Sequence, residues 1–562
     1  MKLLITLMEA ILLLTGAGSE EELNESVIER FERYAGNPLP LNTAGRSMLL
    51  ESGLLSEYQL AVLLDHRKRA GTLHSYTELA LLDGFGEQLA EALKFFTTLS
   101  GESVRSESLH AEALLRGSLR VRDGAVRGAE GVKLLLELPG RAALFWGSRN
   151  TYDNGRFTPG SFNLEYRGKN GRWKLLAGDF NARFGQGLCA WSGFSLSGFS
   201  STGAFQRKAQ GITASHSFSE TLRGLAASGD MGPVTLSGGI YATGLREKME
   251  GKSSAGIGPG YCLNAVYRWR WGHAGLSAAG RAAAPILSTD WRMGAKGLAW
   301  SGEIAWDFAG KDIAALTTLL WKPRYGMEAA LNLRYFGPQY RNPISGAPRA
   351  SGTSNRDEAG GAAALSTPWG TVSYDICTKP SSGGIGHKAV LSAGYAWHAG
   401  PVEIKPALRA VLSWRSWSGI PLRTDLRGDL DATLGNWALN LRYNTVLCRD
   451  RAWLWYAETG YSGVWLRFSL FKADKWDDRI YVYERDLSGA FSVPASYGRG
   501  WSLSLCTNQT LRGKRLRHRI GVKASYIHYY PSDVKRGSAF EGKVQYIIDW
   551  GWRFPSSSRA SP

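Results

Sequence analysis

Residues 261–271 carry the sequence YCLNAVYRWRW, in which apolar and polar side chains alternate. One face of this segment, if extended, holds Tyr261, Leu263, Ala265, Tyr267, Trp269 and Trp271. The opposite face holds Asn264, Arg268 and Arg270. Successive side chains of a β-strand point to opposite faces, so this alternation predicts a strand with one apolar and one polar face.

The same alternation recurs in many short segments between residues 111 and 554. Residues 408–415, 437–444 and 544–554 are three further examples. Segments of about ten residues, with aromatic side chains toward their ends, are typical of a transmembrane β-barrel. A soluble sandwich, solenoid or propeller is the alternative, but it explains neither the aromatic strand ends nor the absence of a regular repeat.

The predicted fold class is therefore mainly β, with a large antiparallel transmembrane barrel over residues 111–554. We expect roughly 18–26 strands, and at that size side chains from opposite walls do not fill the lumen. The last strand ends on Phe554, as in the recognition strand of outer-membrane proteins, and residues 555–562 form a C-terminal tail.

The composition excludes several other classes. The chain of 562 residues has 68 Gly, 21 Trp, 23 Tyr and 20 Phe, and 44% of its residues are apolar. Its mean hydropathy is nevertheless −0.22, so the apolar residues are dispersed, which excludes a helical membrane protein with apolar runs of about 18 residues. So many aromatic residues also argue against disorder. The five cysteines lie far apart and predict neither a disulfide framework nor a zinc site.

The first 18 residues are organised like an export signal. Lys2 precedes an apolar core over residues 3–14, and small residues follow at positions 15–18. The alternative is a short buried helix.

Charge divides the chain near Gly101. Residues 19–37, an expected acidic helix, have a net charge of −4, and residues 38–100 have a net charge of −2. Because the whole chain carries +18 and the first 18 residues are neutral, residues 101–562 carry +24. We therefore predict a domain boundary here, with a linker over residues 101–110.

Residues 38–100 have a helical pattern with two hairpins. The second hairpin turns at Asp83-Gly84-Phe85-Gly86, and together with Leu41-Asn42-Thr43-Ala44 it resembles the tandem helix-hairpin-helix unit of ComEA-type competence proteins. In that family a turn of this kind brings backbone N–H groups to a DNA phosphate. The resemblance makes Gly84, Phe85 and Gly86 candidate phosphate contacts. The first hairpin, Gly53-Leu54-Leu55, lacks the second glycine, and a structural or protein-contact role is the alternative.

Three stretches within the barrel region carry a second resemblance. They are residues 178–193 (GDFNARFGQGLCAWSG), 340–343 (YRNP) and 479–500 (RIYVYERDLSGAFSVPASYGRG). Together with the hairpin unit, they resemble the large exported helix-hairpin-helix/β-barrel proteins of Bacteroidetes. The resemblance implies a small periplasmic helical domain ahead of an outer-membrane barrel, and it implies no settled activity.

No catalytic or metal-binding constellation is visible, so we predict no enzyme activity, no metal and no cofactor. The nine histidines have neither H-x-H nor H-x-x-x-H spacing. His216, between Ser215 and Ser217, is interpreted as a polar loop or lumen histidine. Residues 184–187 (FGQG) are expected to form a glycine-rich hairpin or an inward-folded constriction. Residues 340–357 are expected to form a long external loop.

Arginines recur on the polar face of the predicted strands. They are Arg268, Arg270, Arg334, Arg409, Arg415, Arg442, Arg467 and Arg553. An arginine facing hydrocarbon costs about 2–4 kcal/mol at the membrane midplane, so they should point into the lumen or lie at the membrane edge. Two roles stay open: a basic lining that favours anions, or pairing with luminal Asp and Glu that stiffens the wall.

These features predict an integral outer-membrane barrel with a periplasmic domain that plugs or docks at its mouth and serves transport or envelope assembly. Its expected partners are outer-membrane lipid and a periplasmic or outer-membrane protein. The alternative is a DNA-binding or DNA-uptake protein that passes duplex DNA through the lumen.

Overall fold

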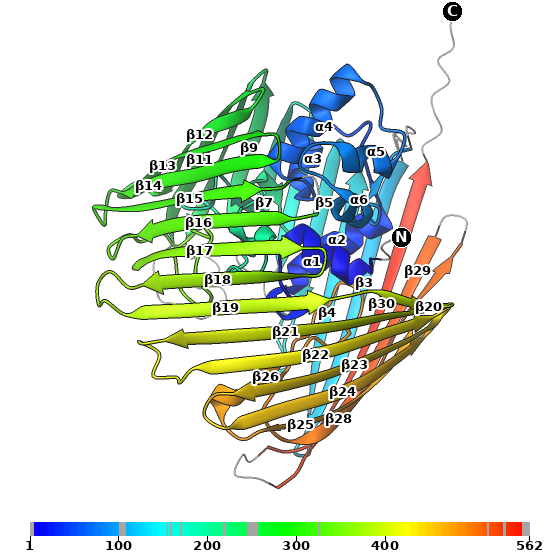
Figure 1. Cartoon of the computed structure of the whole chain (residues 1–562). Helices are drawn as coiled ribbons and strands as arrows, with labels where there is room; N and C mark the ends of the chain where they lie inside the picture. The colour runs from blue at the N-terminus through cyan, green and yellow to red at the C-terminus, as the bar shows by residue number, and fades with distance from the viewer. Residues whose placement is uncertain are drawn as a thin grey trace, which may run out of the picture.

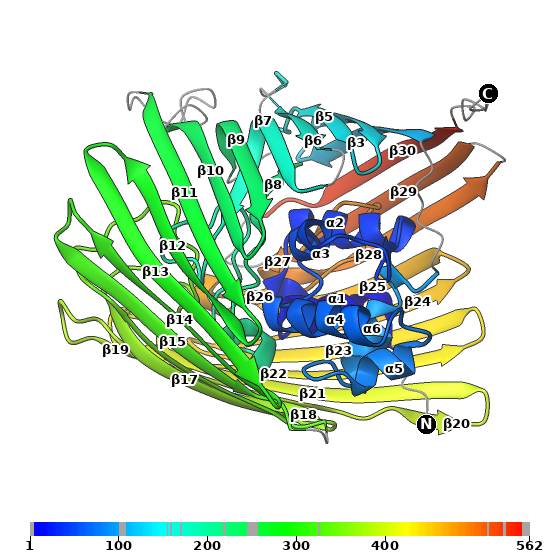
Figure 2. The same ribbon diagram turned by 90° about the horizontal axis from the view of Figure 1, so that it is seen from above.

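The computed structural model describes residues 5–100, 108–153, 155–157, 160–168, 171–216, 221–243, 257–323, 326–513, 516–531 and 536–553. Twenty-four strands form one closed antiparallel barrel, and the helices of the N-terminal region lie inside it (Figure 1; Figure 2, seen from above). The predicted fold class is confirmed, and the strand number lies within the expected range.

The wall consists of long strands joined in sequence order. They are β3 (Ser108–Arg122), β4 (Ala125–Leu138), β5 (Ala142–Arg149), β6 (Ser161–Arg167), β7 (Trp173–Arg183), β9 (Leu222–Met231), β10 (Val234–Thr243), β11 (Gly258–Trp269), β12 (Gly272–Arg281), β13 (Ala284–Ala295), β14 (Leu298–Asp307), β15 (Asp312–Trp321), β16 (Glu328–Phe336), β17 (Glu358–Thr367), β18 (Gly370–Thr378), β19 (Ile385–Gly394), β21 (Val402–Arg415), β22 (Arg423–Leu434), β23 (Trp437–Leu447), β24 (Arg451–Tyr461), β25 (Val464–Ala473), β28 (Gly498–Arg512), β29 (Leu516–Tyr529) and β30 (Ala539–Arg553). Strand β30 pairs with β3 and closes the ring. Short strands β8 (Gly211–Ala214) and β20 (Trp397–Ala399) pair with β7 and β21, and β26 (Ile480–Tyr481) pairs with β27 (Ala495–Ser496).

Alternation along each strand separates an apolar outer face from a polar inner face. In β11, Leu263 and Tyr267 are more than half exposed, whereas Asn264, between them, is 7% exposed. In β14, Trp300 and Trp306 lie on the exposed face. A band of exposed apolar and aromatic side chains around a closed barrel is what contact with lipid hydrocarbon requires.

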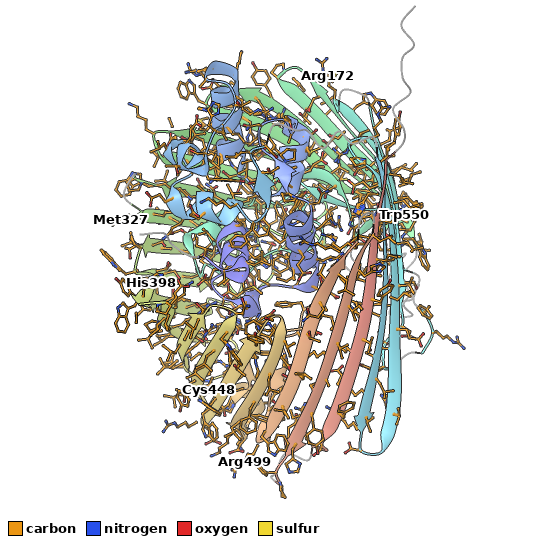
Figure 3. The ribbon with its side chains drawn as sticks, turned by 90° about the vertical axis from the view of Figure 1, so that its right-hand side faces the viewer. Arg172, Met327, His398, Cys448, Arg499 and Trp550 are labelled. Atoms are coloured by element: carbon orange, nitrogen blue, oxygen red, sulfur yellow. The ribbon has the colours of Figure 1, made fainter. Side chains whose placement is uncertain are left out.

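The two ends of the barrel differ in their connections. Residue Ser108 pairs with Arg553, so the first and last wall strands place both chain ends on one side. Connections on that side are short, such as residues 232–233 and 296–297, whereas residues 184–221, 337–357 and 474–497 make long connections on the other side. Figure 3 shows Arg172, in a short turn, and Arg499, after a long connection, at opposite ends. This asymmetry is typical of barrels with periplasmic termini.

The long connections fold into the barrel, which corrects the prediction of an external loop over residues 340–357. Tyr340 and Ala347 are fully buried. The Tyr340 hydroxyl donates to the Leu188 carbonyl at 2.9 Å, and Asn342 Nδ2 donates to the Cys189 carbonyl at 2.8 Å. Because these groups find partners on another inward connection, the segment is not held in solvent.

The described N-terminal residues, 5–100, form a compact helical unit, here called the inner domain. It comprises α1 (Leu7–Thr15), η1 (Glu20–Glu22), α2 (Glu25–Gly36), α3 (Arg46–Ser52), α4 (Glu57–Arg69), α5 (Tyr76–Leu81) and α6 (Glu87–Leu93), with a parallel pair β1 (Leu39–Pro40) and β2 (Thr97–Thr98). Phe31 and Phe96 pack edge to face at 5.0 Å in its core. Ser56 and Ser75 cap α4 and α5.

The stretch expected to be an export signal forms α1, whose Ala10, Ile11 and Leu14 are buried in the core of the inner domain. This corresponds to the alternative of a short buried helix, and removal of the stretch as a signal stays a prediction. Among the helices that the structure describes, none is both long enough and apolar enough to cross a bilayer. Linker residues 101–107, Phe554 and residues 555–562 lie outside the described residues.

Candidate functional site

Acidic side chains of the inner domain meet basic side chains of the wall. The clearest case is η1, where Glu20 lies 3.4 Å from Arg427 and 3.8 Å from Arg442. Glu21 lies 3.3 Å from Arg427 and 3.0 Å from Arg442. Asp429 lies 2.5 Å from each of the two arginines, so the cluster is continuous from the inner domain into strands β22 and β23.

Similar pairs surround the inner domain on other sides. They are Glu9–Lys405 at 3.4 Å, Glu22–Arg409 at 2.9 Å, Glu25–Arg116 at 3.2 Å, Glu29–Lys133 at 2.8 Å, Glu51–Lys174 at 2.8 Å and Glu57–Arg292 at 3.2 Å. Their basic members come from strands β3, β4, β7, β13 and β21. The acidic inner domain and the basic wall therefore meet through ion pairs that are distributed around the lumen.

Burial would raise the pKa of Glu20, but the Arg427 and Arg442 guanidiniums outweigh burial and lower it from 4.5 to about 2. The pKa values of Glu22, Glu25, Glu51 and Glu57 are also lowered, in each case because basic wall side chains overcome the effect of burial. All five carboxylates are therefore held in the charged form, in which they attract the wall.

We expect acid to loosen the inner domain. A carboxylate with a lowered pKa stabilises the bound state fully above its ordinary pKa of 4.5, and this stabilisation is lost as the pH falls toward the lowered value. For Glu20 the shift corresponds to about 3 kcal/mol. Pepsin is the protease of choice because it is active in acid. Pepsin cleavage of residues 5–100 should increase as the pH falls from 4 to 2. Unchanged resistance at pH 2 contradicts this prediction.

The inward connections cover the inner domain from the side opposite the chain ends. Lys208 Nζ donates to the carbonyls of Leu14 at 2.6 Å and Leu54 at 3.1 Å. Ser488 Oγ and the Gly489 N–H both donate to Glu32 at 2.7 Å. Leu196, Phe194 and Phe491 extend the apolar core of the inner domain. The three stretches that carry the family resemblance all contribute to these connections.

Glu303 of β14 anchors the first inward connection. Its carboxylate accepts the N–H groups of Gln186 at 2.7 Å, Leu188 at 3.0 Å and Cys189 at 3.0 Å. Glu303 itself is fully buried. Residues 184–187 thus lie inside the barrel, and Gly185 and Gly187 adopt the positive φ angles that the tight turn requires.

The arginines singled out from the sequence have different environments. Arg409 and Arg442 contact the inner domain. Arg334 pairs with Glu358 and Asp375, Arg467 pairs with Glu458, and Arg268 lies 3.9 Å from Asp230. Arg415 donates to the Ser351 carbonyl.

Two of these arginines lie at strand ends. Arg270 is exposed in the turn after β11, with its guanidinium 4.6 Å from the Trp271 ring, because the strand ends at Trp269. Arg553 lies in β30, and its side chain is outside the described residues.

In the Gly84-Phe85-Gly86 turn, two backbone N–H groups are bonded within the inner domain. The N–H of Phe85 donates to the Leu82 carbonyl at 3.2 Å, and the N–H of Gly86 donates to the Ala80 carbonyl at 3.1 Å. The Phe85 side chain is buried in the core. A Cβ on Gly84 would lie 2.8 Å from the Tyr58 ring, which also packs against Gly294 of the wall. The turn therefore positions Tyr58 against the barrel, and phosphate contact at Gly84, Phe85 and Gly86 stays a prediction.

His216 has no acidic partner for catalysis among the described residues. Arg33 Nη2 contacts its Nδ1, and the ring packs on Phe145 at 4.3 Å between centroids. Ser217 lies outside the described residues. Within the described part of the chain, no group of three His, Cys, Asp or Glu side chains is placed to hold a metal ion.

Sequence reasoning missed a cavity of about 2010 Å³ between α2, α3 and strands β4–β8. We call it the lateral cavity. Its basic lining side chains are Arg30, Arg33, Arg46, Arg141, Arg167, Arg172, Arg183, Arg207 and Lys208, against Glu29, Glu51, Glu137, Glu165 and Asp230. None of the eight arginines chosen from strand alternation lines it, since its cations come mainly from helices, loops and strand ends.

Comparisons with known proteins extend to the fold only. No protein-family model and no curated protein matches the chain. The chain is similar to OccK5 (OpdH) of Pseudomonas aeruginosa, with 11% identity, 79% of this chain and 98% of that chain covered, and a TM-score of 0.31. It is similar to the outer membrane protein OpdK of Pseudomonas aeruginosa, with 11% identity, 79% of this chain and 99% of that chain covered, and a TM-score of 0.29. It is also similar to the P pilus usher (PapC) translocation pore, with 10% identity, 79% of this chain and 100% of that chain covered, and a TM-score of 0.38.

Proposed function

We propose that this protein is an integral outer-membrane channel whose helical N-terminal domain enters the lumen from the periplasm and closes it. The apolar outer face of the closed ring supports insertion into lipid. Both chain ends on the side with short turns support a periplasmic position for the inner domain. No enzyme activity and no cofactor are part of this proposal.

The ring of ion pairs between the inner domain and the wall is the observation that carries the proposal. A domain that only filled space would need apolar contacts with the wall strands, whereas the apolar contacts of the inner domain are with the inward connections, at Leu196, Phe194 and Phe491. Ion pairs that are separated can instead be solvated by water, so each half tolerates exposure when the domain leaves. The interface therefore suits a plug that moves, and we place transport ahead of envelope assembly.

Removal of the plug should create a pore. We expect the full chain to conduct little in planar bilayers, and a variant lacking residues 19–100 to conduct at least about tenfold more, because a barrel of this size has a wide lumen. With the acidic domain gone, the basic wall should favour anions. The full chain should also fractionate with outer membranes and migrate differently on gels with and without heating.

Three results would contradict the proposal. They are a protein recovered in the soluble periplasmic fraction, a truncated barrel that folds but stays closed, and a truncated barrel that prefers cations. Folding of the truncated barrel is checked by its heat-dependent migration, so that a closed pore is distinguished from an unfolded chain. The predicted protein partner is sought separately, by isolating the full chain with its neighbours from membranes.

A further inference from the structure

The lateral cavity contains a cluster of cations without acidic partners. Arg30 and Arg33 come from α2, Arg183 ends β7, and Arg207 and Lys208 lie in the connection before β8. Among the described residues, no carboxylate forms an ion pair with any of these five side chains. Elsewhere in the lumen the basic side chains that contact the inner domain meet a glutamate, so this cluster departs from the pattern of the interface.

The hydrogen bonds of the cluster are made to neutral groups. Arg183 Nε donates to the Ser192 carbonyl at 3.2 Å, and Arg207 donates to the carbonyls of Gly346 at 2.7 Å and Leu196 at 2.5 Å. Lys208 donates to the carbonyls of Leu14 and Leu54. Carbonyl oxygens orient these cations but leave their charge uncompensated.

Two further donors on the cavity lining are unused. Arg30 Nε and Gln206 Nε2 are buried and have no hydrogen-bond partner. Burial, together with the nearby Lys322 and Arg30 charges, lowers the pKa of Lys208 to about 7. Burial also lowers the pKa of Arg207, and the neighbouring Arg349 and Arg183 charges act in the same direction. Grouping like charges away from water is unfavourable unless an anion compensates them.

Other cations on or beside the cavity lining do have carboxylate partners. Arg167 lies on the same lining but is paired with Glu51 at 2.5 Å and with Glu165. Lys174, next to it, is paired with Glu51. The same lining therefore holds cations that are paired with glutamates and cations that are not.

The cavity is reached from the side of the barrel that carries the chain ends. Its lining includes Pro139 and Gly140, in the short turn after β4, and Gly171 and Arg172, in the turn before β7. Its inner part is lined by Trp191 and Phe194 of the first inward connection. A ligand would thus enter at the rim beside Arg141 and Arg172 and move inward toward the unpaired cations.

We propose that the lateral cavity binds a small polyanion, a molecule with two or more phosphate or carboxylate groups, held mainly by Arg30, Arg183 and Lys208. A volume of about 2010 Å³ accommodates such a molecule with its hydration water. The proposal deepens the proposed function by naming the class of cargo, and it rests on that function only for the step from binding to passage.

Binding is measured on the full chain in detergent by titration calorimetry, with inorganic triphosphate and tricarballylate as the phosphate and carboxylate probes. We expect saturable binding of at least one probe at about 150 mM salt, where unpaired surface charges contribute little. Arg30→Gln and Lys208→Gln should each weaken binding at least about tenfold, because each removes a charge-assisted hydrogen bond. Lys208→Arg keeps the charge and should retain most of the affinity.

Arg467→Gln is the matched control, because it removes one luminal positive charge outside the lateral cavity. Its effect should stay within about twofold, since salt screens a charge beyond the Debye length. Heat-dependent migration checks that each variant is folded, and Arg33→Gln, at an exposed position of the same cavity, replaces Arg30→Gln if that variant does not fold.

Absence of saturable binding of both probes to the folded full chain would overturn the proposal. So would equal weakening by Arg467→Gln and Lys208→Gln. Because binding is measured on the closed protein, the outcome is independent of conductance. A protein that binds but never conducts contradicts the channel and supports the site, whereas a protein that conducts without binding contradicts the site alone.

Discussion

A barrel carrying Glu20→Arg and Glu21→Arg is expected to lose its closed state. The two new guanidiniums would lie beside Arg427 and Arg442, which Glu20 and Glu21 now approach to between 3.0 and 3.8 Å. Breaking a buried charge pair costs about 3–5 kcal/mol, which changes the ratio of closed to open forms by more than about a hundredfold. Single-channel conductance in planar bilayers measures the change, and trypsin cleavage of residues 5–100 measures release of the domain.

Two further variants test whether charge is the cause. Glu20→Gln with Glu21→Gln removes attraction without adding repulsion, so its open fraction should lie between those of the wild type and the arginine variant. Asp65→Arg with Glu87→Arg makes the same change in net charge on the same domain. Asp65 pairs with Arg69 on its own helix, and Glu87 is exposed, so this control should stay closed. If the control opens as readily as the Glu20 and Glu21 variant, the ion pairs are not what holds the domain.

Replacing Glu303 by alanine is expected to release the first inward connection while leaving the barrel closed as a ring. Three N–H groups, of Gln186, Leu188 and Cys189, would lose their acceptor in a fully buried site. A buried donor left without a partner costs about 1–3 kcal/mol, so the loss of the acceptor of three such groups is expected to cost at least about 3 kcal/mol. Hydrogen exchange of these three amides should accelerate by about a hundredfold.

Glu403→Ala provides the comparison for this variant. Glu403 is also a wall glutamate, but it lies near the His398 and Lys405 side chains, at 3.9 and 3.6 Å, rather than near backbone N–H groups of an inward connection. Exchange at Gln186, Leu188 and Cys189 should be unchanged in this control. Preserved protection of the three amides in Glu303→Ala would show that other contacts of residues 184–216 hold the connection.

Much of the fold follows from local pattern. Successive side chains of a strand point to opposite faces. Leu263, Asn264 and Tyr267 are therefore assigned to their faces without any tertiary information. Helix caps at Ser56 and Ser75 are likewise local. Arg270 shows the limit of this reasoning, because alternation does not reveal that β11 ends one residue earlier, at Trp269.

The inward course of residues 340–357 could not be predicted from their composition. Pro, Gly, Ser and Asn are common both in exposed loops and in irregular buried segments whose polar groups are satisfied. What distinguishes the two cases is the hydrogen-bond partners. The Tyr340 hydroxyl donates to the Leu188 carbonyl, which lies more than 150 residues earlier in the chain. The lateral cavity was missed for a related reason, since Arg30, Arg183 and Lys208 belong to three separate segments that only the fold brings together.

The sequence by itself determined that a basic barrel follows an acidic helical segment, because strand period and net charge are properties of contiguous residues. Only the tertiary structure decided which charges meet. Glu21 and Arg442 are separated by 421 residues, and their contact at 3.0 Å depends on strand register, ring closure and the depth of the inner domain. Period-two alternation fixes the face on which a side chain lies but not what lies opposite, so the paired ring and the unpaired cations of the lateral cavity emerge only when the barrel closes around residues 5–100.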